Sequence, residues 1–210
     1  MKKNYFSTRF QYDRKRDYVW KKITSYLKRY IPEDSVVLDL GAGYCNFVNN
    51  IEAKEKHALD IFPDMKKYAN VDVISHSSYS TGMSSIKSNH FDVVFASNFF
   101  EHLSDDDMSK TISEIRRILK RGGKLIVIQP NFKYSYKTYY DDYTHKTAYT
   151  DTGMKDLLTL HNFDVEVCIP RFLPFSLKSR LSVLSFLIPV YLRLPYRPFA
   201  KQMFFVASKK

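Results

Sequence analysis

The chain has 210 residues, 44% of them apolar, which is enough for one sizeable hydrophobic core but not for several domains. Its 33 lysines and arginines against 22 aspartates and glutamates give a net charge of +11, which favours anionic partners without choosing among phosphates, nucleic acid and lipid headgroups. Its only cysteines, Cys45 and Cys168, stand far apart, which argues against a disulfide framework and a zinc site.

The N-terminal segment, residues 1–20, is basic but has no continuous apolar stretch and no small-residue cleavage site, which argues against secretion. A helix is predicted over Asp17–Tyr30, because Val19, Ile23 and Leu27 fall on one face and lysines and arginines on the other. We therefore expect a cytoplasmic protein in which residues 1–30 form an N-terminal helical cap.

Five apolar runs predict strands, at 35–40, 56–61, 71–75, 91–97 and 123–129. The clearest helix between them is Ser104–Arg121, with regularly spaced apolar residues, three aspartates in its first turn and Gly122 after its end. A tyrosine-rich loop, a helix near 151–161 and strands at 163–169 and 202–209 follow. This alternation predicts an open, doubly wound α/β sheet that binds its ligand at the carboxyl ends of the strands.

The stretch VLDLGAGYCNF, where the first strand ends, is the strongest functional motif. Gly41 and Gly43 let the backbone turn sharply and approach a ligand, and a helix after them would present free N–H groups. Asp39 precedes this turn, and Asp60 closes the second strand, where an acid accepts hydrogen bonds from ribose hydroxyls. This combination indicates an adenosine-type ligand.

Two common nucleotide-binding loops fit the motif less well. The dinucleotide pattern G-x-G-x-x-G requires a third glycine where Asn46 stands, and a P-loop requires a lysine that this turn lacks. The sequence therefore disfavours a dinucleotide and a nucleoside triphosphate.

On these residues the chain resembles the class I S-adenosylmethionine-dependent methyltransferases. The resemblance covers residues 30–129 and rests on VLDLGAGYCNF, ALDIFPD, FDVVFASNFFEHL and LKRGGKLIVIQPN, in that order. It implies a Rossmann-like, doubly wound, mostly parallel seven-stranded sheet with helices on both faces and an antiparallel last strand. It also implies one domain over residues 1–210 and S-adenosylmethionine as the cosubstrate.

The resemblance also implies residue roles on the cosubstrate side. In the family, the first-strand acid and glycines hold the methionine portion and the ribose environment, here Asp39, Gly41 and Gly43, and the second-strand acid, here Asp60, binds the ribose hydroxyls. Residues after the fourth strand line the cosubstrate, which adds Ser97, Asn98 and Phe99.

The chain departs from the family at two places. Cys45 stands where a third glycine is frequent, and VISHSSYS lacks the acid that often binds adenine after the third strand. Ser75, His76 or backbone groups would then take the place of that acid.

The acceptor side is predicted in the loop after the fifth strand. Methyl transfer requires alignment of the two partners and, for a hydroxyl acceptor, removal of a proton. We assign His145 as the general base and Asp142 as the group that orients it, the alternative being that both only hold the loop together. No metal site is expected, because Asp141, Asp142 and His145 make at most an incomplete set of ligands.

Two features near this loop stay open between structure and function. His102, in FFEHL, has either a packing or capping role or a role in the active site. Five tyrosines, at positions 134, 136, 139, 140 and 143, suit stacking on sugar or base faces, although most are expected to pack the loop onto the sheet.

The C-terminal part of the chain, residues 170–206, mixes apolar residues with cations. Such a face suits docking on an anionic membrane surface through 177–197, whereas we prefer a substrate lid or a homodimer contact. Its longest apolar run, 181–194, is shorter than the roughly 20 residues that a membrane-spanning helix needs and contains Pro189. We expect insertions at 130–150 and 170–200 to cover the substrate side.

The loop and this tail are similar to a bacterial subgroup of small methyltransferases associated with surface-polysaccharide or glycan assembly. We therefore predict methyl transfer from S-adenosylmethionine to an oxygen, less readily a nitrogen, of an anionic small or glycan-linked acceptor, in the cytoplasm or at the inner face of the membrane. The alternatives are a lipid, quinone-precursor or RNA acceptor, and a non-catalytic nucleotide-binding or membrane-associated scaffold. No DNA partner is expected, and RNA is disfavoured because no RNA-binding module is recognisable.

Overall fold

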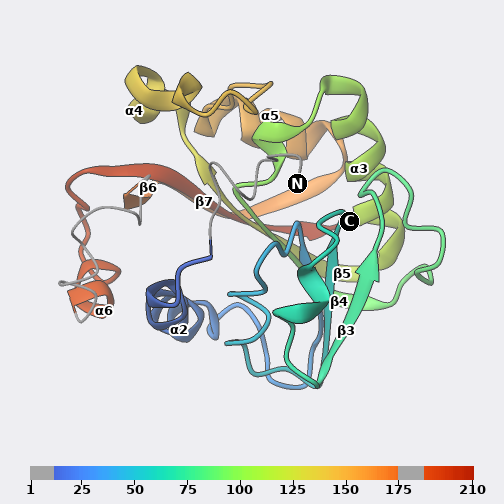
Figure 1. Cartoon of the computed structure of the whole chain (residues 1–210). Helices are drawn as coiled ribbons and strands as arrows, with labels where there is room; N and C mark the ends of the chain where they lie inside the picture. The colour runs from blue at the N-terminus through green and yellow to red at the C-terminus, as the bar shows by residue number, and fades with distance from the viewer. Residues whose placement is uncertain (1–11, 175–186) are drawn as a thin grey trace.

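The computed structural model describes residues 12–174 and 187–210, which contain seven strands in one sheet (Figure 1). The strands are β1 (Val36–Leu40), β2 (Glu55–Asp60), β3 (Val73–Ser77), β4 (Phe91–Ser97), β5 (Leu119–Pro130), β6 (Phe163–Pro174) and β7 (Ala200–Lys209). Their spatial order is β3-β2-β1-β4-β5-β7-β6. The first five strands are parallel, and β7 pairs antiparallel with β5 and β6. The predicted Rossmann-like sheet with an antiparallel last strand is confirmed.

Helices cover both faces of this sheet. The described helices are α2 (Lys15–Leu27), α3 (Asp105–Ile118), α4 (Phe132–Ser135), α5 (Asp151–Leu160) and α6 (Ile188–Tyr191). Short 3-10 turns are η1 (Met65–Lys67), η2 (Phe100–His102) and η3 (Tyr136–Asp141). Figure 1 shows α3 and α5 on one side of the sheet and α2 with α6 on the other.

The core has two parts because β1 and β4 are apolar on both faces. Leu38 and Leu40 pack with residues of α3 and α5, whereas Val37 packs on the opposite face with residues of α2. Central parallel strands covered on both sides have this pattern, as the sequence predicts.

The order of the strands fixes where a ligand binds. β1 lies between β2 and β4, so the chain leaves β1 toward one side of the sheet and later returns on the other. In doubly wound sheets, the crevice at the carboxyl ends of such strands is the ligand site. The turn after β1 and the residues after β4 therefore face each other across this crevice.

Two predicted helical segments differ in the structure. α3 ends at Ile118 instead of Arg121, because Leu119 is extended and pairs with Phe91 at the start of β4. Residues 41–50 form consecutive turns instead of a regular helix. Cys45 has a φ of +57°, which interrupts right-handed helical backbone.

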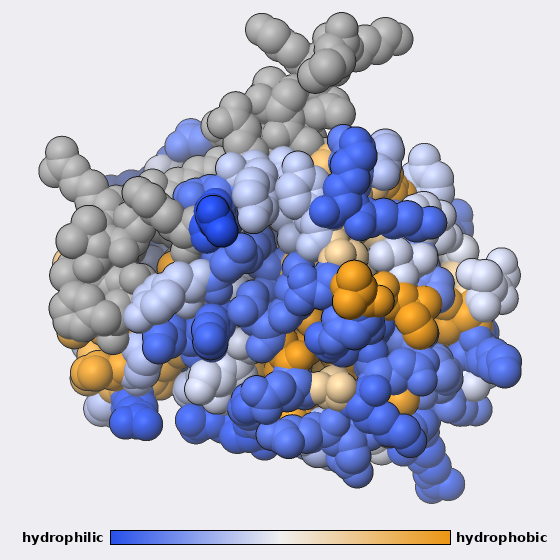
Figure 2. Space-filling view, turned by 60° about the horizontal axis from the view of Figure 1, so that its bottom comes forward, coloured by the Kyte–Doolittle hydropathy of each residue, from blue (hydrophilic) through white to orange (hydrophobic). Residues whose placement is uncertain are grey.

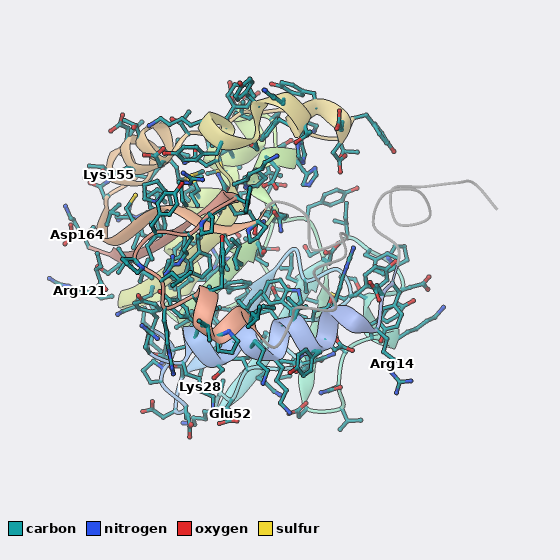
Figure 3. The ribbon with its side chains drawn as sticks, turned by 90° about the vertical axis from the view of Figure 1, so that its left-hand side faces the viewer. Arg14, Lys28, Glu52, Arg121, Lys155 and Asp164 are labelled. Carbon is teal, nitrogen blue, oxygen red and sulfur yellow. The ribbon has the colours of Figure 1, made fainter. Side chains whose placement is uncertain are left out.

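The helix α2 starts two residues before the predicted Asp17 and ends at Leu27, three residues before Tyr30. Its buried residues include Val19, Ile23 and Leu27. Just beyond its end, Lys28 pairs with Glu52 at 2.5 Å on the surface (Figure 3).

The predicted lid or membrane segment is described only in part. Residues 175–186 lie outside the described part of the chain, as do residues 1–11 of the predicted cap. Of the described helices, none combines the length and the apolar character that a membrane span requires. The face in Figure 2 is mostly hydrophilic, with smaller apolar areas between hydrophilic residues.

Candidate active site

The glycine turn after β1 has a backbone that only small residues fit. Gly41 has a φ of +73°, and a Cβ placed on it would lie 2.3 Å from the Phe99 ring. The N–H of Gly41 donates to the carbonyl of Leu59 at 2.8 Å, which fixes the turn against β2. Any larger residue at position 41 would displace Phe99 or the turn.

The departure at Cys45 has a structural explanation. Its positive φ is the conformation for which glycine is favoured, so the position frequently held by glycine in the family keeps that backbone here. The side chain is fully buried, and burial raises the pKa of the thiol to about 12. Cys45 is therefore an unreactive core residue.

The two predicted acids differ in their burial and hydrogen bonds. Asp39 is buried and accepts a hydrogen bond from the N–H of Val48 at 3.3 Å, and burial raises its pKa to about 8. Asp60 is half-buried and accepts hydrogen bonds from the N–H groups of Gly43 and Phe62, both at 2.8 Å. Burial also raises the pKa of Asp60. Asp39 therefore fixes the chain after the turn through Val48, and Asp60 fixes the turn itself through Gly43.

The segment after β4 reaches the same crevice. Ser97 and Phe99 are half-buried, and Asn98 is exposed with a φ of +49°. The Asn98 N–H donates to Ile128 at 2.8 Å, and its side-chain oxygen accepts from Gln202 at 2.6 Å. Phe99 lies against Gly41, so of these three residues Phe99 meets the predicted cosubstrate loop.

The histidine considered for adenine binding lies within a cluster on the sheet. His76 Nε2 is 2.8 Å from His57 Nδ1, and His57 Nε2 is 2.6 Å from the Glu55 carboxylate. Ser75 is half-buried on the same strand. The adenine contact therefore stays a prediction.

A second group of polar side chains forms where η2 meets the loop after β5. One ligand-type atom from each of Glu101, His102 and His145 lies within 4.8 Å of the other two. The ring centroid of His145 is 5.0 Å from that of His102 and 4.5 Å from that of Tyr139. The sequence prediction singled out His145 and left His102 open, but it missed Glu101.

Hydrogen bonds connect the predicted Asp142 to this group through Thr144. The Asp142 carboxylate accepts from the Thr144 hydroxyl at 2.7 Å and from its N–H at 3.1 Å. The same hydroxyl lies 3.0 Å from His102 Nδ1. Asp142 thus acts on His102 through Thr144, in addition to its electrostatic effect on His145.

Burial shifts the protonation of this group. Burial raises the pKa of Glu101 to about 8. The backbone N–H of Glu101 opposes this shift, and the charge of Asp142 adds to it. Burial and the neighbouring His145 lower the pKa of His102 to about 4. Shifted acids and imidazoles in a cleft are typical of functional sites.

A second residue that the sequence prediction missed is Gln129, near the end of β5. It is fully buried, and neither its amide oxygen nor its amide nitrogen has a hydrogen-bond partner among the described groups. The sequence does indicate this residue, because Gln129 is a polar residue at the end of an apolar strand, at the edge of the sheet where ligands bind. Glu101 is likewise a polar residue shortly after an apolar strand, two residues after Phe99.

The loop after β5 presents most of its tyrosines to solvent. Tyr134, Tyr136, Tyr140 and Tyr143 are 38%, 56%, 58% and 70% exposed. Tyr139 is buried and donates to the Thr147 carbonyl at 2.5 Å. The expectation that most of the five pack the loop onto the sheet is wrong, because the short helical turns over 132–141 leave three rings exposed and Tyr143 follows them, also exposed.

Several solved structures with this fold are described as S-adenosylmethionine-dependent methyltransferases. One from Archaeoglobus fulgidus aligns with a TM-score of 0.65 at 23% identity, over 90% of this chain and 94% of that one. Another from Thermotoga maritima, described as a possible histamine N-methyltransferase, aligns with a TM-score of 0.68 at 16% identity, over 93% and 91%. The chain has the fold of the class I methyltransferases.

Sequence comparison agrees with the fold. Residues 38–127 match the family model for a methyltransferase domain. An uncharacterized protein of Methanocaldococcus jannaschii is 32% identical over 120 residues, which are 54% of this chain and 49% of that protein. The chain thus spans about half the length of this curated relative. Residues 38–127 are thus similar to methyltransferase domains, and this similarity and the fold imply S-adenosylmethionine as the cosubstrate.

The residues at the glycine turn fit this cosubstrate. Asp60 is half-buried, and each of its two carboxylate oxygens accepts one backbone hydrogen bond. Because a carboxylate can accept about four hydrogen bonds, Asp60 can still accept hydrogen bonds from ribose hydroxyls. The turn at Gly41 carries no side chain that would block a close approach.

Proposed function

We propose that this protein transfers the methyl group of S-adenosylmethionine to a hydroxyl oxygen of a small or sugar-linked acceptor. The observation that supports this proposal most is the position of four exposed tyrosines on the loop that also carries His145. Tyrosine faces stack on sugar rings, and their hydroxyls form hydrogen bonds with sugar hydroxyls. Nitrogen acceptors fit less well, because an amine already presents a lone pair and gains less from nearby bases.

On the cosubstrate side, the predicted residues have distinct tasks. Asp60 accepts hydrogen bonds from the ribose, and the turn at Gly41 and Gly43 lets the backbone approach the ligand. Asp39 keeps the turn in place by its contact with Val48. The residues that line the ligand beyond β4 are Ser97, Asn98 and Phe99. The sulfonium of the cosubstrate supplies an activated methyl group.

On the acceptor side, the group of Glu101, His102 and His145 receives the acceptor hydroxyl. An in-line displacement needs the oxygen aligned behind the methyl carbon and its proton removed as the O–C bond forms. His145 is the base that the sequence predicts, and Asp142 orients the group through Thr144. Burial of this group excludes water, which would otherwise weaken its polar interactions.

The acceptor is proposed to carry an anionic group, such as a phosphate. Arg171 lies over the rings of Tyr134 and Tyr196, 4.9 and 5.1 Å from their centroids. A guanidinium held between aromatic rings presents donors to a phosphate while its flat faces are covered. The net charge of +11 adds a long-range attraction for such an acceptor.

Two measurements test the proposal in sequence. Calorimetric titration should show binding of S-adenosylmethionine and much weaker binding of NAD. The protein is then incubated with methyl-labelled S-adenosylmethionine and a panel of nucleoside diphosphate sugars, in which at least one sugar should become labelled. Tight binding of NAD without S-adenosylmethionine would contradict the cosubstrate. Labelling of a lipid or RNA fraction, but of no sugar, would replace the proposed acceptor.

A further inference from the structure

The carboxyl group of Glu101 is buried without a partner. The residue is 1% exposed, and neither carboxyl oxygen forms a hydrogen bond with another residue in the described part of the chain. A buried polar group without a partner destabilises a fold. Native proteins contain few such groups, and an ion outside the polypeptide is one common explanation.

Two imidazoles lie beside this carboxyl group. One ring nitrogen each from His102 and His145 lies within 4.8 Å of a Glu101 oxygen and of the other ring nitrogen. Metal–ligand bonds of about 2.0 to 2.2 Å place ligand atoms about 3 to 4 Å apart, so small side-chain rotations bring the three atoms into one coordination sphere.

Hydrogen bonds fix the tautomer of His102. The Thr144 hydroxyl donates its proton to Asp142, so at 3.0 Å from His102 Nδ1 it accepts the proton of that nitrogen. His102 Nε2 then carries the lone pair that a metal ion needs. A ligand histidine whose other nitrogen donates to an oriented group is the usual arrangement around protein-bound metals.

Backbone contacts hold the two segments together before any ion binds. The Glu101 carbonyl accepts from the N–H groups of Lys146 and Thr147 at 2.8 and 3.2 Å, and the Thr147 hydroxyl donates to Leu103 at 3.0 Å. These contacts place His145 next to η2. The ligands therefore come from a preorganised pair of segments and not from a single loop.

We propose that Glu101, His102 and His145 bind a divalent transition-metal ion. Two imidazoles and one carboxylate suit Zn²⁺, Co²⁺ or Mn²⁺ better than Mg²⁺, which prefers oxygen ligands. Three protein ligands leave coordination positions for water or an acceptor hydroxyl. The site goes beyond the proposed methyl transfer and does not depend on it. It gives His145 the role of a ligand in place of a free base.

The chain contains a second Glu–His–His cluster, which provides a matched control. One ligand-type atom from each of Glu55, His57 and His90 also lies within 4.8 Å of the other two. There, however, the Glu55 carboxylate already bonds His57 at 2.6 Å, and His57 bonds His76 at 2.8 Å. Because these donors and acceptors satisfy one another, this cluster does not need an ion.

The test is a titration of the metal-stripped full-length protein with Co²⁺, followed by visible absorption and calorimetry. We expect one Co²⁺ per chain with the absorption bands of nitrogen and oxygen ligands. Since partners outside the coordination sphere alone change metal affinity by about 10- to 100-fold, Glu101→Gln should weaken Co²⁺ binding by at least about 100-fold. Glu55→Gln should keep the wild-type affinity, and Co²⁺ should raise the Tm of wild type but not of Glu101→Gln.

The variants also show how the proposal fails. Equal Co²⁺ affinity in wild type and Glu101→Gln would contradict it, and loss of binding in Glu55→Gln alone would move the ion to the second cluster. Circular dichroism of both variants excludes unfolding as the cause. Failure of methyl transfer with Co²⁺ binding intact would contradict the proposed function and leave the metal site standing.

Discussion

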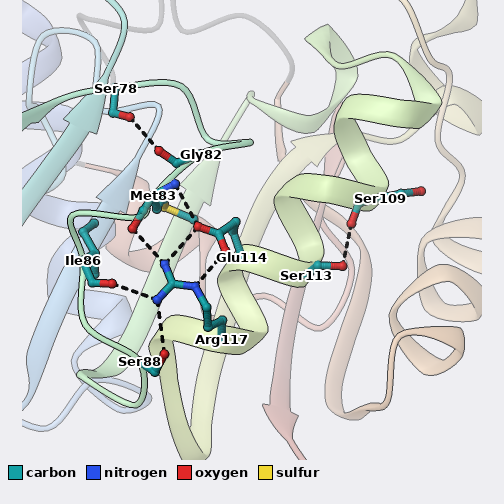
Figure 4. Close-up of polar contacts among 9 residues, drawn as sticks. All are labelled: Ser78, Gly82, Met83, Ile86, Ser88, Ser109, Ser113, Glu114 and Arg117. Atoms are coloured by element: carbon teal, nitrogen blue, oxygen red, sulfur yellow. Dashed lines mark hydrogen bonds and ion pairs between the residues drawn. The ribbon is translucent and has the colours of Figure 1, made fainter.

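Two polar groups on either side of β4 differ in whether the fold satisfies them. In the connection that precedes β4, the carbonyls of Met83 and Ile86 accept hydrogen bonds from Arg117 of α3 at 2.8 Å, and Arg117 also donates to Glu114 at 2.7 Å (Figure 4). The other oxygen of Glu114 accepts from the Met83 N–H at 2.8 Å. After β4, Glu101 is more deeply buried but accepts no hydrogen bond from the described residues.

The difference separates a structural site from a functional one. The Arg117 group closes on itself and fastens the connection between β3 and β4 to α3. The Glu101 group has acid and imidazoles in place, but its carboxyl group has no hydrogen-bond partner among the described residues, and we propose that an acceptor or an ion takes that position. Proteins tolerate such unsatisfied groups chiefly at functional sites.

The largest expected effect comes from breaking the functional group. His145→Ala should lower methyl transfer by about 10²- to 10⁴-fold, because either a base or a metal ligand is lost. Binding of S-adenosylmethionine, measured by calorimetry, should change little, since His145 lies on the acceptor side. His161→Ala, at the end of α5, is the control and should keep wild-type turnover.

Chelation separates the two roles of His145. If it is a ligand, removal of metal from wild type should lower transfer by a similar factor, and Mn²⁺ or Co²⁺ should restore it in wild type but not in His145→Ala. Full activity of chelated wild type together with an inactive His145→Ala would make His145 the base and show that methyl transfer does not need the metal ion.

The sequence predicts the fold well because strand patterns are local. Central strands are apolar on both faces, and Ser104 caps α3 through a hydrogen bond from Asp107, so their positions follow from short stretches of sequence. The regular helix expected after the glycines fails because Cys45 adopts a positive φ, which the residue type does not signal.

The candidate site is only partly readable from the sequence. His145 and Asp142 stand in one conspicuous loop, but Glu101 joins them through backbone contacts across about 45 residues of chain. The outward position of four tyrosines likewise depends on short helical turns that spacing alone does not predict. What a group lacks, such as a partner for Glu101, appears only when its surroundings are known.

An intermediate effect is expected from breaking the structural group. Arg117→Met should lower the free energy of unfolding by about 2 kcal/mol, because it leaves the Met83 and Ile86 carbonyls and Glu114 without their donor. For a chain of this size that corresponds to a Tm lower by about 4 to 8 °C.

Glu101→Gln in the metal-free protein should change the free energy of unfolding by less than about 0.5 kcal/mol, since the amide has the same shape and replaces an unpaired group. Urea unfolding measures both, and a larger loss in Glu101→Gln would reverse the comparison.

The smallest effect is a pH dependence that belongs to the structural group. The hydrogen bond and charge of Arg117 lower the pKa of Glu114 below its usual value of 4.5. A carboxyl whose pKa is lower in the folded protein stabilises the fold above its unfolded pKa, and this contribution is lost as the pH falls through the folded pKa. The stability difference between wild type and Glu114→Gln should therefore be largest near neutral pH and shrink below about pH 4.5, as measured by urea midpoints across that range.

Glu166→Gln, which removes a more exposed ion pair with Lys124, should lower stability little at any pH because solvent screens that pair. A difference for Glu114→Gln that stays constant down to low pH would mean that Glu114 stabilises the connection independently of its charge.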